Sequence, residues 1–228
     1  MENVEFIYAS RSGFIVILIV IMAGFTGLRY AYTNIFKNTY HAIALFSFKP
    51  MAEQGAGIKL LSTENLLITL LLASSLSFSI LIFVQHFNLL ENNVLFSSFG
   101  LFGSWVLISI CVGLLFLIKF IFLMLSGWLF DFPLSQSAHY QEYQSMSHVF
   151  NFIFVLALGL GLIAMPKMSD GFIWTMAYVY IAFFLYRQII LLLRLYGKGG
   201  YSIYYIFSYL CTTELIPWIV CIGILWDR

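Results

Sequence analysis

The sequence predicts an all-α polytopic membrane protein, a bundle of about six transmembrane helices in one domain over residues 1–228. Of its 228 residues, 62% are hydrophobic and only 9% are charged, whereas soluble domains carry about 25% charged residues. A water-soluble fold of this length could not cover so much apolar surface with a polar shell. The apolar residues also form continuous runs instead of alternating, which favours helices over the strands of a barrel.

Six runs are long enough to cross the hydrocarbon core of a bilayer, which takes roughly 20 residues. They cover approximately residues 13–28, 66–84, 100–123, 149–165, 172–193 and 203–226. The third run stays apolar as far as Phe130. The fourth run is the shortest, and Pro166 should stop it because proline has no N–H for a helical hydrogen bond.

The connections between the runs differ in length. In the first, Phe36, Tyr40 and Ile43 share one helical face, which predicts a short interfacial helix at about residues 35–48. The connection 131–148 is polar and is predicted to be a loop, and 197–200 is predicted to be a turn.

Basic residues avoid the translocated side of a membrane, and here they are divided unequally between the two faces. One face has seven: Arg29, Lys37, Lys49, Lys59, Arg187, Arg194 and Lys198. The other has three: Arg11, Lys167 and Arg228. We therefore expect the long connections to be cytoplasmic and both termini to lie outside.

Three ionisable residues fall within the predicted spans: Lys119, Arg187 and Glu214. Each costs on the order of 3 kcal/mol at the bilayer centre unless it is paired or hydrated. A rise of about 1.5 Å per residue allows all three to share one layer. We expect a cluster in which Glu214 is flanked by the two cations.

A kink site accompanies this cluster in the sixth run. Pro217 leaves the carbonyl of Thr213 without its helical partner, and Cys211 lies one turn before Glu214. Free carbonyls in broken helices bind cations in transporters, but a proline commonly does no more than kink a membrane helix. Two interpretations therefore stay open: a structural lock between helices, or a transport or proton site.

Enzymatic and metal chemistry have little support in the sequence. No nucleophile or metalloprotease motif occurs and no cofactor is expected, so an enzyme is the least favoured class. His139, Glu142 and His148 could form a metal site in the connection 131–148, but we expect solvated loop residues there. The pairs Ala23/Gly27 and Ala157/Gly161 are predicted to allow close helix contacts.

The last run contains Tyr209, Leu210, Cys211, Thr212, Thr213, Glu214, Leu215, Ile216 and Pro217. This string, together with the pair Tyr186–Arg187, resembles the domain-of-unknown-function 4271 family of multi-pass bacterial membrane proteins. The resemblance extends over nearly the whole chain. It implies the inner membrane of an envelope with two membranes, and it implies that Arg187, Cys211, Glu214 and Pro217 matter to the family.

The leading functional hypothesis is a non-enzymatic inner-membrane subunit or assembly factor in envelope biogenesis or secretion. The alternative is a small transporter or proton-coupled channel that uses the charge cluster. The expected partners are the lipid bilayer and a membrane protein or a second copy of the chain. A net charge of +1 disfavours nucleic acid, because it provides no basic surface for phosphates.

Overall fold

The computed structural model describes residues 2–33, 63–87, 94–130, 133–165 and 169–197. These residues form five long helices and no strand: α1 (Glu2–Ala31), α4 (Thr63–His86), α5 (Val94–Phe130), α6 (Pro133–Ala164) and α7 (Asp170–Gly197). The protein is therefore a polytopic helical bundle, as its composition predicts.

Each helix contains an apolar segment long enough to cross a membrane. The segments are Arg11–Ala31, Thr63–His86, Gly100–Ile121, Met146–Ala164 and Asp170–Ile190. They coincide, within a few residues at each end, with the first five predicted runs, which are therefore helical. The predicted sixth run at 203–226 and the interfacial helix at 35–48 lie outside the described residues.

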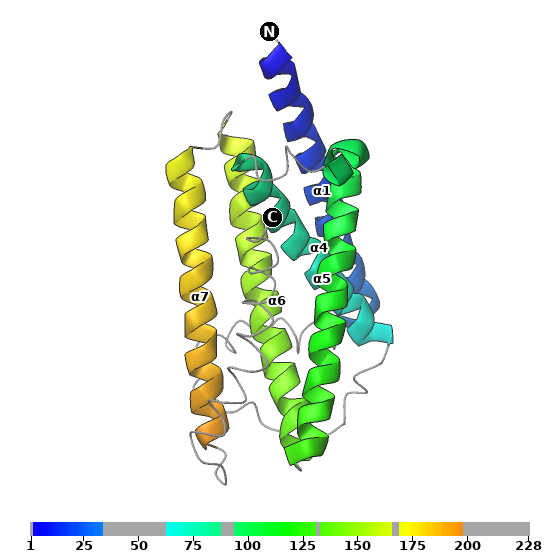
Figure 1. The fold of residues 1–228 in the computed structure, drawn as a ribbon, viewed down its shortest axis with the longest axis vertical. Coiled ribbons are helices and arrows are strands. Elements are labelled where there is room, and N and C mark those ends of the chain that lie inside the picture. The colour runs from blue at the N-terminus through cyan, green and yellow to red at the C-terminus, as the bar shows by residue number, and fades with distance from the viewer. Residues whose placement is uncertain (1, 34–62, 88–93, 131–132, 166–168, 198–228) are drawn as a thin grey trace.

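The helices run up and down through the bundle (Figure 1). One end carries the last residues of α1, α5 and α7 and the first residues of α4 and α6. We call it the long-connection end. The opposite end, called the N-terminal end, carries the first residues of α1, α5 and α7 and the last residues of α4 and α6.

The core lies mainly on α4 and α6. Of the residues in their apolar segments, 56% and 61% are buried, against 11% and 17% in α5 and α7. Ile17 of α1, Phe78 of α4 and Leu158 of α6 are fully buried in the main apolar cluster. The flanking helices therefore present most of their apolar surface outward, as a membrane allows.

Two glycines of α6 allow neighbouring side chains to approach closely. A Cβ at Gly159 would lie 2.6 Å from Leu18 of α1, and one at Gly161 would lie 2.6 Å from the ring of Phe172 in α7. The expected contact at Gly161 is thus present. At Gly27 a Cβ would meet nothing within 4 Å among the described residues, so no such contact is seen there.

The predicted loop at 131–148 is wrong in structure, because α6 is helical from Pro133 onward. Proline suits the first turn of a helix, where its missing N–H has no intrahelical partner to lose. A helix of 32 residues is about 48 Å long, well beyond a hydrocarbon core of about 30 Å. The polar residues of 133–145 thus extend the helix beyond its apolar segment, which begins at Met146.

The third apolar segment begins at a break in α5. Gly100 has φ 63° and ψ −178°, which interrupts the helix between Val94 and Phe130. This backbone conformation belongs to glycine, because a side chain would be strained there. The apolar segment thus starts at Gly100, where the predicted run starts, although helix precedes it.

Arg11 of α1 caps the C-terminus of α6. Its Nε donates to the carbonyl of Leu162 at 3.0 Å, and its Nη2 donates to the carbonyl of Ile163 at 2.8 Å. The last four carbonyls of a helix lack intrahelical donors and carry a partial negative charge, so a guanidinium both satisfies and neutralises them. Arg11 thereby attaches the first helix to the fourth at the N-terminal end.

Replacement of Gly159 by valine tests the close approach of α6 to α1. Because the new side chain meets Leu18, we expect Gly159→Val to lower the free energy of unfolding by about 1–3 kcal/mol. Unfolding in detergent micelles, followed by circular dichroism, measures the change. Gly27→Val is the matched control at an open position, and equal losses in both variants would contradict the packing described.

Candidate functional site

Polar side chains of three helices meet inside the bundle. Ser75 of α4, Ser147, His148 and Asn151 of α6, and Arg187 of α7 are all buried. We call this set the buried polar layer. In a bilayer such groups must find partners within the protein, since the hydrocarbon supplies none.

Arg187 connects α7 to α6. Its Nη1 donates to Ser147 Oγ at 3.0 Å, and its guanidinium carbon lies 5.1 Å from the centre of the Phe184 ring. Only 7% of the residue is exposed, although arginine keeps its charge in proteins. A hydroxyl acceptor and a ring face are two sources of stabilisation for a guanidinium that has left water.

Asn151 connects α6 to α4. Its Nδ2 donates to Ser75 Oγ, and the Ser75 hydroxyl donates in turn to the carbonyl of Leu72 at 2.9 Å. The hydrogen bonds therefore run from α6 into the backbone of α4. The Oδ1 atom of Asn151 is buried and has no hydrogen-bond partner among the described residues.

A small cavity of about 40 Å³ lies within this layer. It is lined by Leu72, Leu76, Phe116, Ser147, Phe150, Asn151, Tyr180, Phe183, Phe184 and Arg187. A space of this size is enough for a water molecule, which needs two to four polar partners. Ser147, Asn151, Tyr180 and Arg187 supply such groups, and a larger solute would not fit.

Part of the layer, the pair Arg187 and Ser147, lies close to the long-connection end of the apolar segments, whereas Ser75 follows Thr63 by twelve residues and lies near the middle of α4. Arg187 stands three residues before the end of its segment at Ile190, and Ser147 is the second residue of the segment that begins at Met146. At about 1.5 Å per residue these positions are within roughly 5 Å of the segment ends. A cation there costs less than at the bilayer centre, because its long side chain can reach toward the headgroups.

The predicted charge cluster is described only in part. Arg187 is in the layer. Lys119 is half-buried and follows Phe116, which lines the cavity, by three residues. Lys119 therefore lies within about one helical turn of the layer. Glu214, Cys211, Thr213 and Pro217 lie outside the described residues, so the full cluster and the kink site stay predictions.

The weak metal candidates lie on a helix and not on a loop. His139, Glu142 and His148 all belong to α6, where positions nine apart, such as 139 and 148, are about 180° apart around the axis. His148 is only 1% exposed, so the expectation that it is a solvated loop residue is wrong. Among the described side chains, no three His, Cys, Asp or Glu residues gather as a metal site would require.

Ser147 and Asn151 are functional candidates that the sequence pattern did not single out. Their signal is a spacing of four residues at the start of an apolar run, which puts both on one face of a helix. The same pattern would also occur at a solvated helix end. The partner residues on α4 and α7 show that the pair is buried instead, and these partners are identified only in the folded structure.

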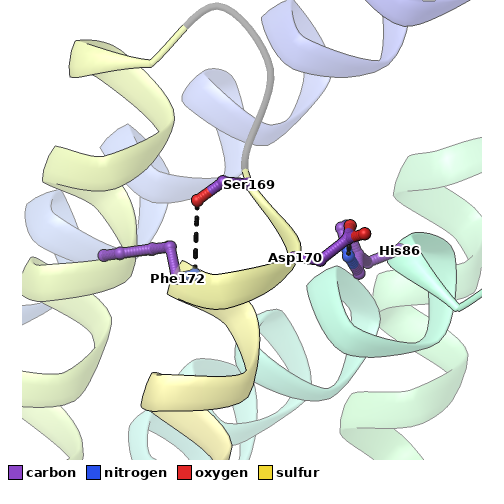
Figure 2. A network of polar contacts seen from close by, with 4 residues as sticks. All are labelled: His86, Ser169, Asp170 and Phe172. Carbon is purple, nitrogen blue, oxygen red and sulfur yellow. Dashed lines mark hydrogen bonds and ion pairs between the residues drawn. The ribbon is translucent and has the colours of Figure 1, made fainter.

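A second polar contact lies at the N-terminal end. His86 Nε2 in the last turn of α4 lies 3.0 Å from Asp170 Oδ1 in the first turn of α7 (Figure 2). Ser169 caps α7, because its Oγ accepts from the N–H of Phe172 at 3.3 Å. An acid at a helix start and a base at a helix end both complement the helix dipoles. Asp170 is 86% exposed, which indicates a surface tether and not a reactive site.

A family model described as "Domain of unknown function (DUF4271)" matches residues 14–225. The chain belongs to the DUF4271 family. The match covers all but the first three residues of the apolar segments of the described helices and all but the last residue of the predicted sixth run, so the resemblance stated from the last two runs is confirmed. Comparison with curated proteins and with solved structures finds no match.

A double-mutant cycle tests the hydrogen bond between α6 and α4. We expect Asn151→Ala and Ser75→Ala each to lower the free energy of unfolding by about 1–2 kcal/mol. Because both remove the same bond, the double variant should lose less than the sum, by about 0.5–1.5 kcal/mol. Unfolding equilibria in detergent micelles measure all three variants.

Ser77→Ala supplies the control for this cycle. Ser77 is equally buried, but its hydroxyl donates to the carbonyl of Ala73 in its own helix. Its effect should add to that of Asn151→Ala without coupling. Strict additivity between Asn151 and Ser75 would show that the bond does not hold the two helices together.

Proposed function

We propose that this DUF4271 protein is a non-enzymatic subunit or assembly factor of the bacterial inner membrane, acting in envelope biogenesis or secretion. The proposal rests on the way in which the buried polar layer joins the helices. Its side chains bond from helix to helix and enclose only about 40 Å³. Such an arrangement suits a rigid scaffold better than a path for solutes.

The outward surface of α7 supports a role in assembly. Trp174, Tyr178, Ile181 and Leu185 are all exposed and recur at intervals of three or four residues along one face. Tyrosine and tryptophan are enriched where proteins bind one another, because they contribute large contact areas with few rotatable bonds. We propose that this face, called the α7 aromatic face, packs against a membrane-protein partner.

The distribution of basic residues supports one orientation of the bundle in the membrane. Arg29 lies in the last turn of α1, at the long-connection end, and most of the other basic residues of the sequence are assigned to the same side. Lysine and arginine concentrate on the cytoplasmic side of membrane proteins. We propose that the long-connection end faces the cytoplasm.

A transporter or proton-coupled channel is the second candidate. Its support is Arg187, which keeps its charge and lines a cavity together with Ser147, Asn151 and Tyr180. Ionisable residues within a span mark ion pathways in many membrane proteins. Such a pathway needs a polar route beyond the cavity, and Glu214 would be the residue that carries the proton.

A pull-down of the tagged protein from its native membranes in mild detergent, followed by mass spectrometry, tests the assembly role. We expect one envelope protein to be recovered in stoichiometric amount. Tyr178→Ala should reduce its recovery several-fold, since central tyrosines often contribute most of the binding energy. Ile19→Ala, at an exposed position of α1, is the matched control and should leave recovery unchanged.

The opposite result has a defined meaning. A protein that purifies without a stoichiometric partner, and whose proteoliposomes conduct protons or ions, would contradict the assembly role. In that case Arg187→Gln and Glu214→Gln should both abolish the flux, and the second candidate would replace the first.

A further inference from the structure

The cavity of the buried polar layer has one wall residue whose hydrogen bonding is incomplete. Asn151 lines the cavity and is only 2% exposed. Its Nδ2 is bonded to Ser75, which is not one of the residues that line the cavity. Its Oδ1 is buried and has no hydrogen-bond partner among the described residues. Oδ1 is therefore the polar atom that this side chain can offer to an occupant of the cavity.

The other polar residues of the cavity wall supply donors. Arg187 carries five N–H groups, one of which is bonded to Ser147 Oγ. The Ser147 hydroxyl accepts that bond and also has an O–H of its own. Tyr180 of α7 adds a second hydroxyl to the wall. The cavity therefore combines an acceptor on α6 with donors on α6 and α7.

This combination selects the chemical class of the occupant. A halide or another small anion only accepts hydrogen bonds, so Asn151 Oδ1 would repel it. A metal ion or an ammonium ion is positively charged, so the guanidinium of Arg187 would repel it. A water molecule both donates and accepts, with two to four bonds in a typical buried site. Of these occupants, only water can bond to the acceptor and to the donors at once.

The size of the cavity and its other walls also agree with water. Its volume of about 40 Å³ exceeds the roughly 10–15 Å³ that a buried water requires. The rest of the wall is apolar and consists of Leu72, Leu76, Phe116, Phe150, Phe183 and Phe184. The rings of Phe150 and Phe183 are stacked with their centres 3.5 Å apart. Apolar surroundings strengthen the hydrogen bonds made inside them.

We propose that this cavity binds one ordered water molecule, which donates to Asn151 Oδ1 and accepts from the donors of α7. Because Asn151 also bonds to Ser75 of α4, the water extends a chain of hydrogen bonds from α4 through α6 to α7. A single enclosed water is a structural link between helices and not a route across the membrane. This site goes beyond the proposed assembly role and does not depend on it.

Filling the cavity tests the water by the sign of the effect. Leu76→Phe enlarges a side chain of the cavity wall. Displacement of the water leaves Asn151 Oδ1 without a partner, so we expect the equilibrium constant of unfolding in detergent micelles to rise about tenfold. A more stable variant would overturn the proposal, because filling an empty space stabilises a protein.

The same substitution in an Asn151→Leu background separates a lost hydrogen bond from overpacking. Asn151→Leu replaces the amide oxygen and nitrogen with methyl groups, so no acceptor is left to lose its water. Leu76→Phe should then leave the unfolding constant nearly unchanged relative to Asn151→Leu alone. A loss of stability as large as in the wild type would overturn the proposal, since overpacking acts in both backgrounds.

A crystal structure that resolves ordered water tests the site without any substitution. We expect a density peak in the cavity within about 3.2 Å of Asn151 Oδ1. The peak should be unchanged when the crystals are soaked in bromide. A cavity without a peak, or a peak that acquires the anomalous signal of bromide, would overturn the assignment to water.

Discussion

The structure depends on the requirement that polar side chains inside an apolar bundle satisfy one another. Hydrocarbon offers no hydrogen bonds, so Asn151 and Ser75 bond across α6 and α4, and Arg187 and Ser147 bond across α7 and α6. Each bond fixes the rotation of one helix against its neighbour. The apolar side chains around these bonds can then pack in only one arrangement of the helices. The close approach of Leu18 to Gly159 also requires that arrangement.

The two ends of the bundle differ in chemistry. At the N-terminal end, Arg11 caps α6 and His86 pairs with Asp170, and these contacts fasten α1 to α6 and α4 to α7. Toward the long-connection end, the buried pair Arg187–Ser147 joins α7 to α6 instead, and the bond between Asn151 and Ser75 joins α6 to α4 nearer the middle of the membrane-embedded region.

Much of the fold follows from the sequence because hydrocarbon thickness dictates the length of an apolar run. Five spans agree with prediction for that reason. The helical start of α6 at Pro133 did not follow, since polar residues beyond the membrane are compatible with a loop or a helix. Likewise, Gly27 and Gly159 look alike in sequence. Gly159 is a contact only because Leu18 lies against it. In the same way, the pairing of Asn151 with Ser75 could be identified only from the folded structure and not from the sequence.

If the buried polar layer is a closed lock between helices, bulk water does not reach it from either side of the membrane. Leu72 lines its cavity and is 2% exposed, so Leu72→Cys in a cysteine-free background reports access of water to the layer. We expect no reaction with a membrane-impermeant thiol reagent from either side, while Thr33→Cys at the exposed end of α1 reacts fully. Labelling of Leu72→Cys at a rate similar to that of Thr33→Cys would contradict the lock and indicate a water-filled path.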